Sequence, residues 1–134
     1  MHTSILVVTG TRHELSAISK ATVRALLLEW HAEAWGQLTV FVGDAKGVDA
    51  AVREWCPDYD AVFDLFKADW DEHGKAAGPI RNTQMVQAAW DSQDAGATVT
   101  FLAFPHMLKP STGTTDCVTK LVRAKIPGRV VLVK

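Results

Sequence analysis

The sequence predicts an α/β protein with a Rossmann-like three-layer architecture, in which helices cover both faces of a parallel sheet of about five strands. Short runs of continuous apolar residues alternate along the 134-residue chain with stretches at helical spacing. Continuous apolar runs are typical of strands buried on both faces, and the alternation implies right-handed crossover connections. We expect a single domain over residues 1–134, a length that fits one core.

The first apolar run and the stretch after it predict a strand and a long helix. The strand spans Ile5 to Val8. Thr11 and Glu14 have the spacing of a capping box, which marks a helix start, and Gly36 is expected to end the helix. The face expected to pack on the sheet consists of Leu15, Ile18, Ala21, Ala25, Leu28 and Ala32.

The next segments predict two strands with a short helix between them. Leu38 to Val42 is a second buried strand. Residues 48–55 place apolar side chains at i, i+3, i+4 and i+7, which predicts a short helix that Pro57 stops. Residues 59–66 predict a third strand, and the charge within it favours a position near an edge of the sheet.

The second half of the chain predicts two more helices and two more strands. Residues 67–78 are polar and contain two glycines, so we expect an irregular loop that can serve as a lid. Pro79 suits the first position of a helix that runs to about residue 93. A strand at 98–104, a helix at 114–125 and a last strand at 130–133 complete the order.

Composition narrows the classes of function. The 14 basic and 15 acidic residues give a net charge of −1, which does not supply the basic surface that nucleic acids require. Cys56 and Cys117 lack metal-ligand spacing, so a structural zinc site is not expected, and two lone thiols suit a reducing compartment. We expect neither a bound metal nor another cofactor. The first apolar run is too short for a signal peptide or a membrane span, so we expect a cytoplasmic protein without membrane contacts.

Three strand-to-helix junctions carry residues suited to ligand binding. The carboxyl ends of parallel strands meet at one edge of a sheet, where ligands bind in this class of fold. Glycines let the backbone approach a ligand, and helix N-termini offer unpaired N–H groups and partial positive charge. The candidates at these junctions are Gly10, Thr11, Arg12, Gly43, Asp44, Lys46, Gly47, Ser111, Gly113, Thr114 and Thr115.

Charged residues at the second junction allow more than one role. Asp44 can cap the following helix or face a ligand. Asp49 lies in the first turn of that helix, where the helix dipole favours a carboxylate, and it can equally bind ribose hydroxyls. Lys46 fits a phosphate partner or a solvated side chain. Because glycines and threonines also suit ordinary turns and caps, the prediction of a site depends on their convergence at one edge.

Arg81 is the most informative single residue. A helix that starts at Pro79 places Arg81 in its first turn, where a cation opposes the helix dipole. An anionic partner would offset this cost, and that partner is either a bound phosphate or a protein carboxylate. In the expected lid, Trp70 can stack on a base or pack against the edge of the domain. The acidic run beside Trp70 is expected to be solvated rather than to bind a metal.

Taken in order along the chain, these motifs resemble the SLOG superfamily, and most closely its small stand-alone branch in bacteria and phages. The resemblance covers nearly the whole chain and depends on the ordered set rather than on any one motif. The motifs are Val8–Arg12, Gly43–Asp49, Ala68–Trp70 with Gly74–Asn82, Ala103–Pro105 and Gly113–Asp116.

The resemblance implies a Rossmann-like fold that binds nucleotides or nucleotide-derived signals. The superfamily includes the Lonely Guy phosphoribohydrolases, which cleave a base from a nucleoside 5′-monophosphate, and sensor domains for nucleotide second messengers. By this resemblance Gly43, Asp44 and Gly113–Thr115 would cradle phosphate and sugar, and Arg81 would match the arginine of the hydrolases' catalytic helix. The resemblance also implies a homodimer. It further implies that Asp69, Trp70, Lys75 and Asn82 contact the ligand.

The sequence departs from the hydrolases at their glycine-rich motif. The hydrolases have Pro-Gly-Gly-x-Gly-Thr-x-x-Glu, whereas seven residues separate Pro105 from Gly113 in this chain. Cys117 stands at the position of the hydrolases' glutamate, and a thiol does not replace a carboxylate as acid or base. The departure favours ligand binding over hydrolysis.

The leading expectation is therefore a sensor, carrier or sequestering protein for a nucleoside phosphate, an ADP-ribose-type molecule or a cyclic nucleotide. The alternative is a hydrolase of an N-glycosidic or phosphate-linked bond. Such an enzyme would use Arg81 as phosphate anchor and Asp116, Asp49 or Asp69 as its carboxylate. A second alternative is a protein interaction module with a vestigial site.

Overall fold

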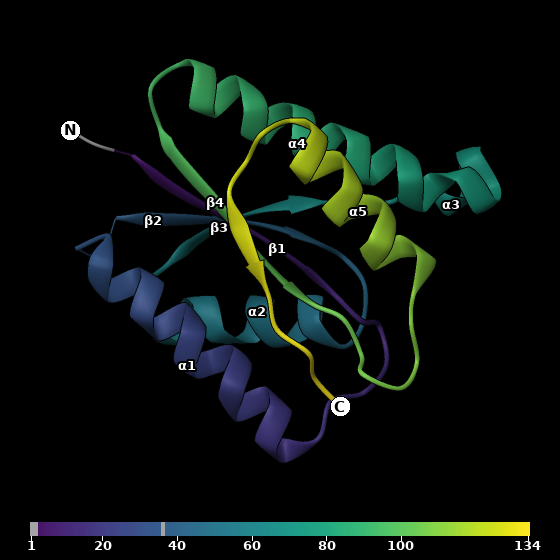
Figure 1. Ribbon diagram of the computed structural model, residues 1–134, viewed down its shortest axis with the longest axis horizontal. Helices are drawn as coiled ribbons and strands as arrows, with labels where there is room; N and C mark the ends of the chain where they lie inside the picture. The colour runs from purple at the N-terminus through teal and green to yellow at the C-terminus, as the bar shows by residue number, and fades with distance from the viewer. Residues whose placement is uncertain (1–2, 36) are drawn as a thin grey trace.

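The computed structural model describes residues 3–35 and 37–134, and it contains a five-stranded parallel sheet between two layers of helices (Figure 1). The order across the sheet is β3-β2-β1-β4-β5, and each neighbouring pair is parallel. This confirms the predicted Rossmann-like three-layer fold, with the third strand at an edge. The strands are β1 (Ser4–Gly10), β2 (Leu38–Gly43), β3 (Val62–Phe66), β4 (Thr98–Phe104) and β5 (Gly128–Val130).

Helices cover both faces of the sheet. α1 (Ala17–Glu33) and α2 (Val48–Asp58) lie on one face, whereas α4 (Ala77–Asp94) and α5 (Thr112–Arg123) lie on the other (Figure 1). The core is correspondingly divided into two apolar clusters, and alternate residues of β1 enter each of them. No helix in the described part of the chain combines the length and apolar character needed to cross a membrane.

The strand order creates a switch point beside β1. From β1 the chain passes outward through β2 to β3, and it then crosses back to place β4 on the other side of β1. The loops that leave β1 and β4 lead to helices on opposite faces of the sheet, and ligands of doubly wound folds bind in the region between two such loops, here called the crevice. Thr11 N–H donates to the carbonyl of Phe104 at 3.0 Å, so the two loops begin side by side.

The predicted start of the first helix is wrong. α1 begins at Ala17, and the hydroxyl of its N-cap, Ser16, accepts from Ser19 N–H at 3.1 Å. Thr11 accepts a backbone N–H two residues on, within an irregular segment, instead of forming the expected capping box with Glu14. Ser16 is therefore the N-cap of α1, and residues 12–16, between Thr11 and the helix, are not helical. The expected end at Gly36 falls outside the described residues.

The prediction of which residues of this helix face the sheet is also wrong. Leu15 is buried but precedes the helix, so its position does not follow helical periodicity. Counting from Leu15 shifts the expected face by one residue, which is about 100° around the helix axis. Ile18 is consequently 75% exposed. The residues of α1 that are buried against the sheet are Ser19, Val23 and Leu27.

Residues 67–78 are largely helical, which corrects the expectation of an irregular lid. α3 (Trp70–His73) and a short 3-10 turn, η1 (Gly74–Ala76), lead directly into α4. Asp69 caps α3 by accepting from Glu72 N–H at 3.0 Å. The polar composition of this segment concealed the cap, because polar residues suit both loops and exposed short helices.

Other boundaries differ by a few residues. α2 includes Pro57 in its last turn, and α5 begins two residues before the predicted start. β5 begins at Gly128 rather than Val130, because the absence of a side chain at Gly128 lets the chain approach the ring of Phe101 on β4. Beyond β5 the chain still follows β4, since Val131 N–H donates to the carbonyl of Ala103 at 2.8 Å.

Candidate functional site

Buried polar side chains gather at the carboxyl edge of the sheet. All but one of them lie at the end of β1, in the loop after it, in the first turns of α2 and α5, or on α4. The exception, Ser19, packs near the start of α1. Buried polar groups cost free energy unless they are hydrogen-bonded, so their concentration sets this edge apart from the core. The buried polar residues of the described chain are Thr9, Thr11, Ser19, Asp49, Asn82 and Thr114.

Arg81 connects the junctions after β2 and β3. It lies in the second turn of α4, because that helix starts at Ala77 rather than at the predicted Pro79. Its Nη1 donates to Asp44 Oδ1 at 3.2 Å and lies 3.5 Å from the carbonyl of Phe66. Of the two anionic partners considered for Arg81, the structure provides the protein carboxylate.

Gly43 makes room for this arginine. A Cβ on Gly43 would overlap Arg81 Nη1 and lie 2.6 Å from Asp49 Oδ2. Arg53, one turn along α2 from Asp49, donates to the carbonyls of Gly43 and Ala45 at 2.8 and 3.0 Å. The loop after β2 is therefore held by two arginines, and only glycine at its start allows both acidic and basic groups to approach the backbone.

Asn82 links this arginine to the start of α5. Its Oδ1 accepts from Arg81 Nε at 2.9 Å, and its Nδ2 donates to the carbonyl of Gly113 and to Asp116 Oδ2, both at 3.1 Å. Lys120 Nζ donates to the same oxygen of Asp116 at 2.9 Å. A single network thus crosses from the end of β2 to the first turn of α5, and Asp116 already has two donors.

Asp49 is the buried carboxylate of the site, with 5% of its surface exposed. Its Oδ2 accepts from Ala45 N–H at 3.2 Å. Burial raises the pKa of Asp49 to about 6, and the positive charge of Arg81 and the Ala45 hydrogen bond oppose this only in part. A carboxyl group with a pKa near neutrality can accept or donate a hydrogen bond and can exchange a proton with a ligand.

The crevice between β1 and β4 contains an unsatisfied hydroxyl. Thr114 is 4% exposed, lies in the first turn of α5, and its Oγ1 has no hydrogen-bond partner among the described residues. Ser111, the N-cap of α5, makes no side-chain capping bond, so the first N–H groups of this helix lack their usual partner. This end of α5 therefore presents several donors that the chain does not satisfy itself.

Cys117 lies about one turn further along α5 and is buried in the apolar cluster between the sheet and the α4–α5 layer. Its thiol is hydrogen-bonded to Thr9 at the end of β1. Burial raises the pKa of Cys117 to about 11, against the smaller lowering effects of Thr9 and Arg81, so the thiol is protonated at neutral pH. Cys117 is buried and neutral, which suits packing rather than nucleophilic chemistry.

Arg12, Lys46 and Gly47 belong to a different part of the edge. They line a depression of about 270 Å³ between α1 and α2, together with Lys20 and Glu54, which the sequence did not single out. The backbone at Gly47 has a φ of +70°, which favours glycine. The structure therefore divides the predicted ligand-binding residues between the crevice and this depression.

The remaining candidates from the first and last junctions support the local backbone. Gly10 ends β1 against the side chain of Val48. Thr11 is fully buried, and its carbonyl accepts from Val48 N–H at 3.0 Å. Thr115 Oγ1 donates to the carbonyl of Ser111 at 3.1 Å. These contacts fix the shape of the crevice rather than leaving free groups in it.

The residues expected in a lid lie on α3 and η1. The Asp69 carboxylate is occupied by capping α3. Trp70 is 55% exposed, and its ring lies 3.6 Å from the position of a Cβ on Gly78, so it packs on the start of α4 with about half of its surface free. Lys75 is exposed in η1. Both roles considered for Trp70 are thus compatible with its position.

Three residues of the network are not among the sequence candidates. Arg53 and Lys120 follow Asp49 and Asp116 by four residues, a helical spacing that brings opposite charges together and would have identified them. Thr9 gives a weaker signal, a polar residue that ends an otherwise apolar strand. Within residues 3–35 and 37–134, no three His, Cys, Asp or Glu side chains are grouped as metal ligands would be.

Comparison with known proteins identifies a relative in a mycobacterial phage. No protein-family model matches the chain. Over 108 residues the chain is 38% identical to the Gene 61 protein of Mycobacterium phage D29, a match that covers 77% of this chain and 78% of that protein. Among solved structures, phenylacrylic acid decarboxylase from Aquifex aeolicus is 11% identical with a TM-score of 0.34, over 98% of this chain and 81% of that chain. This structural likeness is too weak to support any inference about the site.

Proposed function

The chain belongs to the family of the Gene 61 protein of Mycobacterium phage D29, and from its site we propose that it binds a nucleotide or nucleotide-derived ligand at the carboxyl edge of its sheet. It would act as a sensor, carrier or sequestering protein. The observation that carries this proposal is the buried, unpartnered hydroxyl of Thr114 at the uncapped start of α5. The resemblance to the SLOG superfamily, which assigns phosphate and sugar contacts to Gly113–Thr115, is part of the same proposal.

The start of α5 has the chemistry of a phosphate site. A helix N-terminus offers N–H donors and partial positive charge, and Thr114 adds a hydroxyl. A buried hydroxyl without a partner costs about 1–3 kcal/mol, and a phosphate oxygen accepting from Thr114 would remove that cost. The site lies in the crevice beside β1, where the strand order reverses and where ligands of doubly wound folds bind.

The carboxylates beside this crevice suit the uncharged part of such a ligand. Asp44 and Asp49 can accept hydrogen bonds from sugar hydroxyls, as acidic residues do in dinucleotide sites. Arg81 would exchange its bond to Asp44 for a bond to the phosphate, and Asn82 would hold the guanidinium in place during that exchange. A nucleotide provides both kinds of group, hydroxyls and phosphate, within one molecule.

Hydrolysis of an N-glycosidic bond is the second candidate, and the titration of Asp49 favours it. A pKa of about 6 leaves Asp49 able to give or take a proton near neutral pH. The two other residues at the expected catalytic position are less suitable, because Cys117 is protonated and Asp116 is engaged by Asn82 and Lys120. Binding remains the proposed function, because Cys117 and Asp116 do not fit the catalytic role. Asp49 is the carboxyl whose substitution tests for turnover.

A thermal-shift screen of purified protein tests the binding proposal. The ligands are nucleoside monophosphates, NAD, ADP-ribose, cyclic ADP-ribose isomers and cyclic dinucleotides. A ligand at 100 times its Kd stabilises the folded state by about 2.7 kcal/mol, which raises the Tm by several degrees for a domain of this size. Incubating the best ligand with the wild type and with Asp49→Asn, followed by chromatography, would then detect turnover.

Thr114→Val distinguishes a ligand contact from a structural role. Without ligand, this variant should melt at or above the wild-type Tm, because the substitution removes an unsatisfied buried hydroxyl. With ligand, its affinity should fall by about tenfold, the loss expected for one hydrogen bond. Thr114→Ser keeps the hydroxyl and should bind as the wild type does. Equal affinity of Thr114→Val and wild type would refute this contact, and no shift with any nucleotide would leave the interaction module as the better account.

A further inference from the structure

The outer side of β5 is an unpaired strand edge. β5 stands last in the order β3-β2-β1-β4-β5, and only β4 lies beside it among the described strands. Val131 and Val133 donate their N–H groups to carbonyls at the end of β4 and just beyond it, at 2.8 and 3.0 Å, so the chain stays extended past Val130. Backbone groups of successive residues point to opposite sides of a strand, so those of Val130 and Leu132 point away from β4.

The side chains along this edge are apolar and exposed. Val130 and Leu132 are 54% and 59% exposed. They share one face of the strand with Gly128, which lies against the ring of Phe101 in the apolar cluster beneath α4 and α5. Val131, which lies between them, packs against the opposite cluster. A strand added outside β5 would therefore cover apolar surface as well as complete backbone hydrogen bonds.

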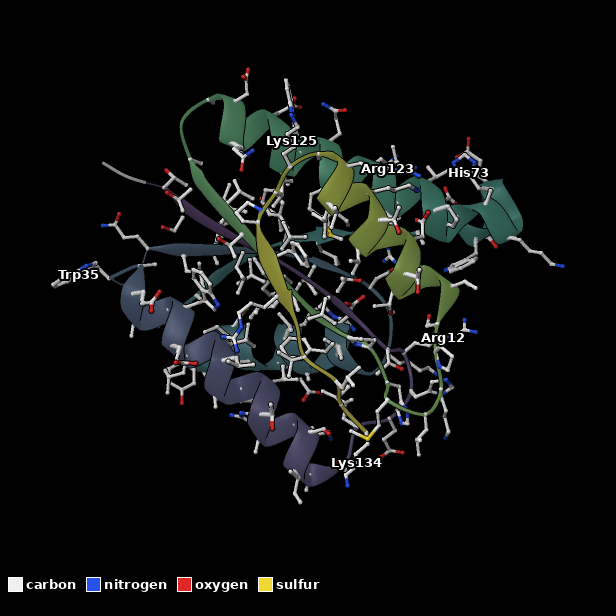
Figure 2. All side chains as sticks on the ribbon, in the orientation of Figure 1. Arg12, Trp35, His73, Arg123, Lys125 and Lys134 are labelled. Carbon is white, nitrogen blue, oxygen red and sulfur yellow. The ribbon has the colours of Figure 1, made fainter. Side chains whose placement is uncertain are left out.

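The part of the chain that contains this edge is strongly basic. The whole protein has a net charge of −1, yet residues 117–134 contain five cations and no Asp or Glu. Four of the five make no ion pair within residues 3–35 and 37–134, namely Arg123, Lys125, Arg129 and Lys134. Figure 2 shows Lys125 near the start of β5 and Lys134 beyond its end. Because Arg129 lies within the strand, positive charge extends along the whole edge.

These features favour an acidic peptide in extended conformation as the occupant. A nucleic acid would satisfy the cations, but it lacks the regularly spaced N–H and C=O groups that pair with a strand. Two copies of this chain joined through their β5 edges would bring like charges together. The β3 edge carries Asp64, with Asp60 just before it, but pairing β3 with β5 would produce an open polymer rather than a closed assembly.

We propose that the outer edge of β5, from Gly128 to Leu132, binds an extended acidic segment of another protein as an additional strand. Carbonyls of the segment accept from the N–H groups of Val130 and Leu132. Its apolar side chains cover these two residues, and its carboxylates lie on the other face, near Arg129. The segment therefore alternates apolar and acidic residues. This proposal does not depend on the proposed nucleotide ligand.

Fluorescence anisotropy with a designed peptide tests the proposal. The probe is a blocked, labelled peptide of alternating valine and glutamate, about eight residues long, and the control peptide has lysine in place of glutamate. The acidic peptide should bind saturably and at least about tenfold more tightly than the basic peptide. Equal affinity for the two peptides, or no binding of the acidic peptide at about 1 mM, would overturn the proposal.

Val130→Pro separates strand pairing from charge attraction. Proline removes the outward N–H, and an edge strand tolerates it at a position whose N–H faces solvent. Val130→Ala is the matched control, because it shortens the same side chain and keeps the donor. Both variants should melt within about 5 °C of the wild type, and the proline variant should bind the acidic peptide at least about tenfold more weakly than the alanine variant. Equal affinity of the two folded variants would contradict strand pairing.

A charge reversal tests the choice of partner, and it does so even if the proline variant does not fold. The double variant Arg129→Glu, Lys134→Glu should bind the acidic peptide more weakly and the basic peptide more tightly, which shifts their affinity ratio by about tenfold. An unchanged ratio would contradict recognition by charge. Sedimentation velocity of the wild type alone gives the last comparison. Open polymers that disappear in Val130→Pro would assign the edge to a second copy and overturn the acidic partner.

Discussion

Gly43 shows how one missing side chain organises the site. The end of β2 is approached by the Arg81 guanidinium and the Asp49 carboxylate from opposite helices, and both occupy space that a Cβ would fill. Gly43→Ala should therefore displace the arginine and destabilise the fold by about 1–3 kcal/mol, as overpacking does. Urea denaturation measures that loss. An alanine variant with wild-type stability and an unchanged Asp44–Arg81 contact would show that position 43 can hold a Cβ without displacing Arg81.

The raised pKa of Asp49 makes the free energy of unfolding depend on pH. Its pKa is raised from 3.8 to about 6 in the folded chain, so the folded state holds the proton more tightly than the unfolded state. The contribution of Asp49 to the free energy of unfolding is therefore most favourable below pH 4, where the carboxyl is protonated in both states. The free energy of unfolding then falls by up to about 3 kcal/mol as the pH rises from about 4 to 6. Above pH 6 the contribution is constant.

Asp49→Asn removes this titration. The variant should be more stable than the wild type at pH 7, and the difference should disappear near pH 4, where the wild-type carboxyl is protonated in the folded chain. Urea denaturation at pH 4, 5.5 and 7 gives the comparison. A difference that is the same at all three values would mean that the charge of Asp49 is not what the substitution changes.

At the residue level, the sequence predicted that the three junctions share one edge of the sheet, but neither which of their residues come together nor how they pair. Glycines, caps and charged residues after strands indicate an edge site, because parallel strands bring their ends together. The partner of Arg81 could not be chosen, since a phosphate and the carboxylate of Asp44 satisfy the same requirement. The separation of Arg12 and Lys46 from the crevice also depends on how α1 and α2 pack, which no local pattern specifies.

At the level of elements, α1 provides a direct test of helix orientation. Leu27 is fully buried, whereas its neighbour Leu28 is 42% exposed. Leu27→Ala should cost about 2–5 kcal/mol, and Leu28→Ala should cost much less, because only the first leaves a cavity in the core. Thermal denaturation of the two variants compares the same chemical change at adjacent positions. Equal losses, or a larger loss at Leu28, would favour the orientation expected from the sequence.

Helix starts proved harder to predict than strands. The apolar runs of β1, β2 and β4 are continuous and short, and their length and β-branched residues favour buried strands over buried helices. The start of α1 was misplaced because Leu15 is buried in an irregular segment, and that of α4 because Pro79 is its third residue rather than its first. Both errors arise where tertiary packing, rather than local preference, decides which residues are helical.

At the scale of the whole molecule, the strand order positions the site. Of the two buried side-chain atoms without a hydrogen-bond partner in the described residues, Thr114 Oγ1 lies at the start of α5, after β4, whereas His31 Nδ1 lies near the end of α1. Alternation of strands and helices predicts a parallel sheet, but the order β3-β2-β1-β4-β5 follows from which crossovers pack best and cannot be counted from the sequence. That order brings the start of the loop after β1 beside the end of β4, whose own loop leads to the start of α5 and the free Thr114 hydroxyl. The strand order therefore determines the position of the candidate site beside β1.

Amide chemical-shift mapping tests the central claim most directly. Uniformly ¹⁵N-labelled protein would be titrated with the nucleotide that stabilises it most, and the ¹H–¹⁵N spectrum followed to saturation. The account predicts that the largest changes fall at the start of α5, at Gly113 and Thr114, and at the ends of β1 and β2. Changes confined to the α1–α2 depression, with the amides at Gly113 and Thr114 unmoved, would contradict it.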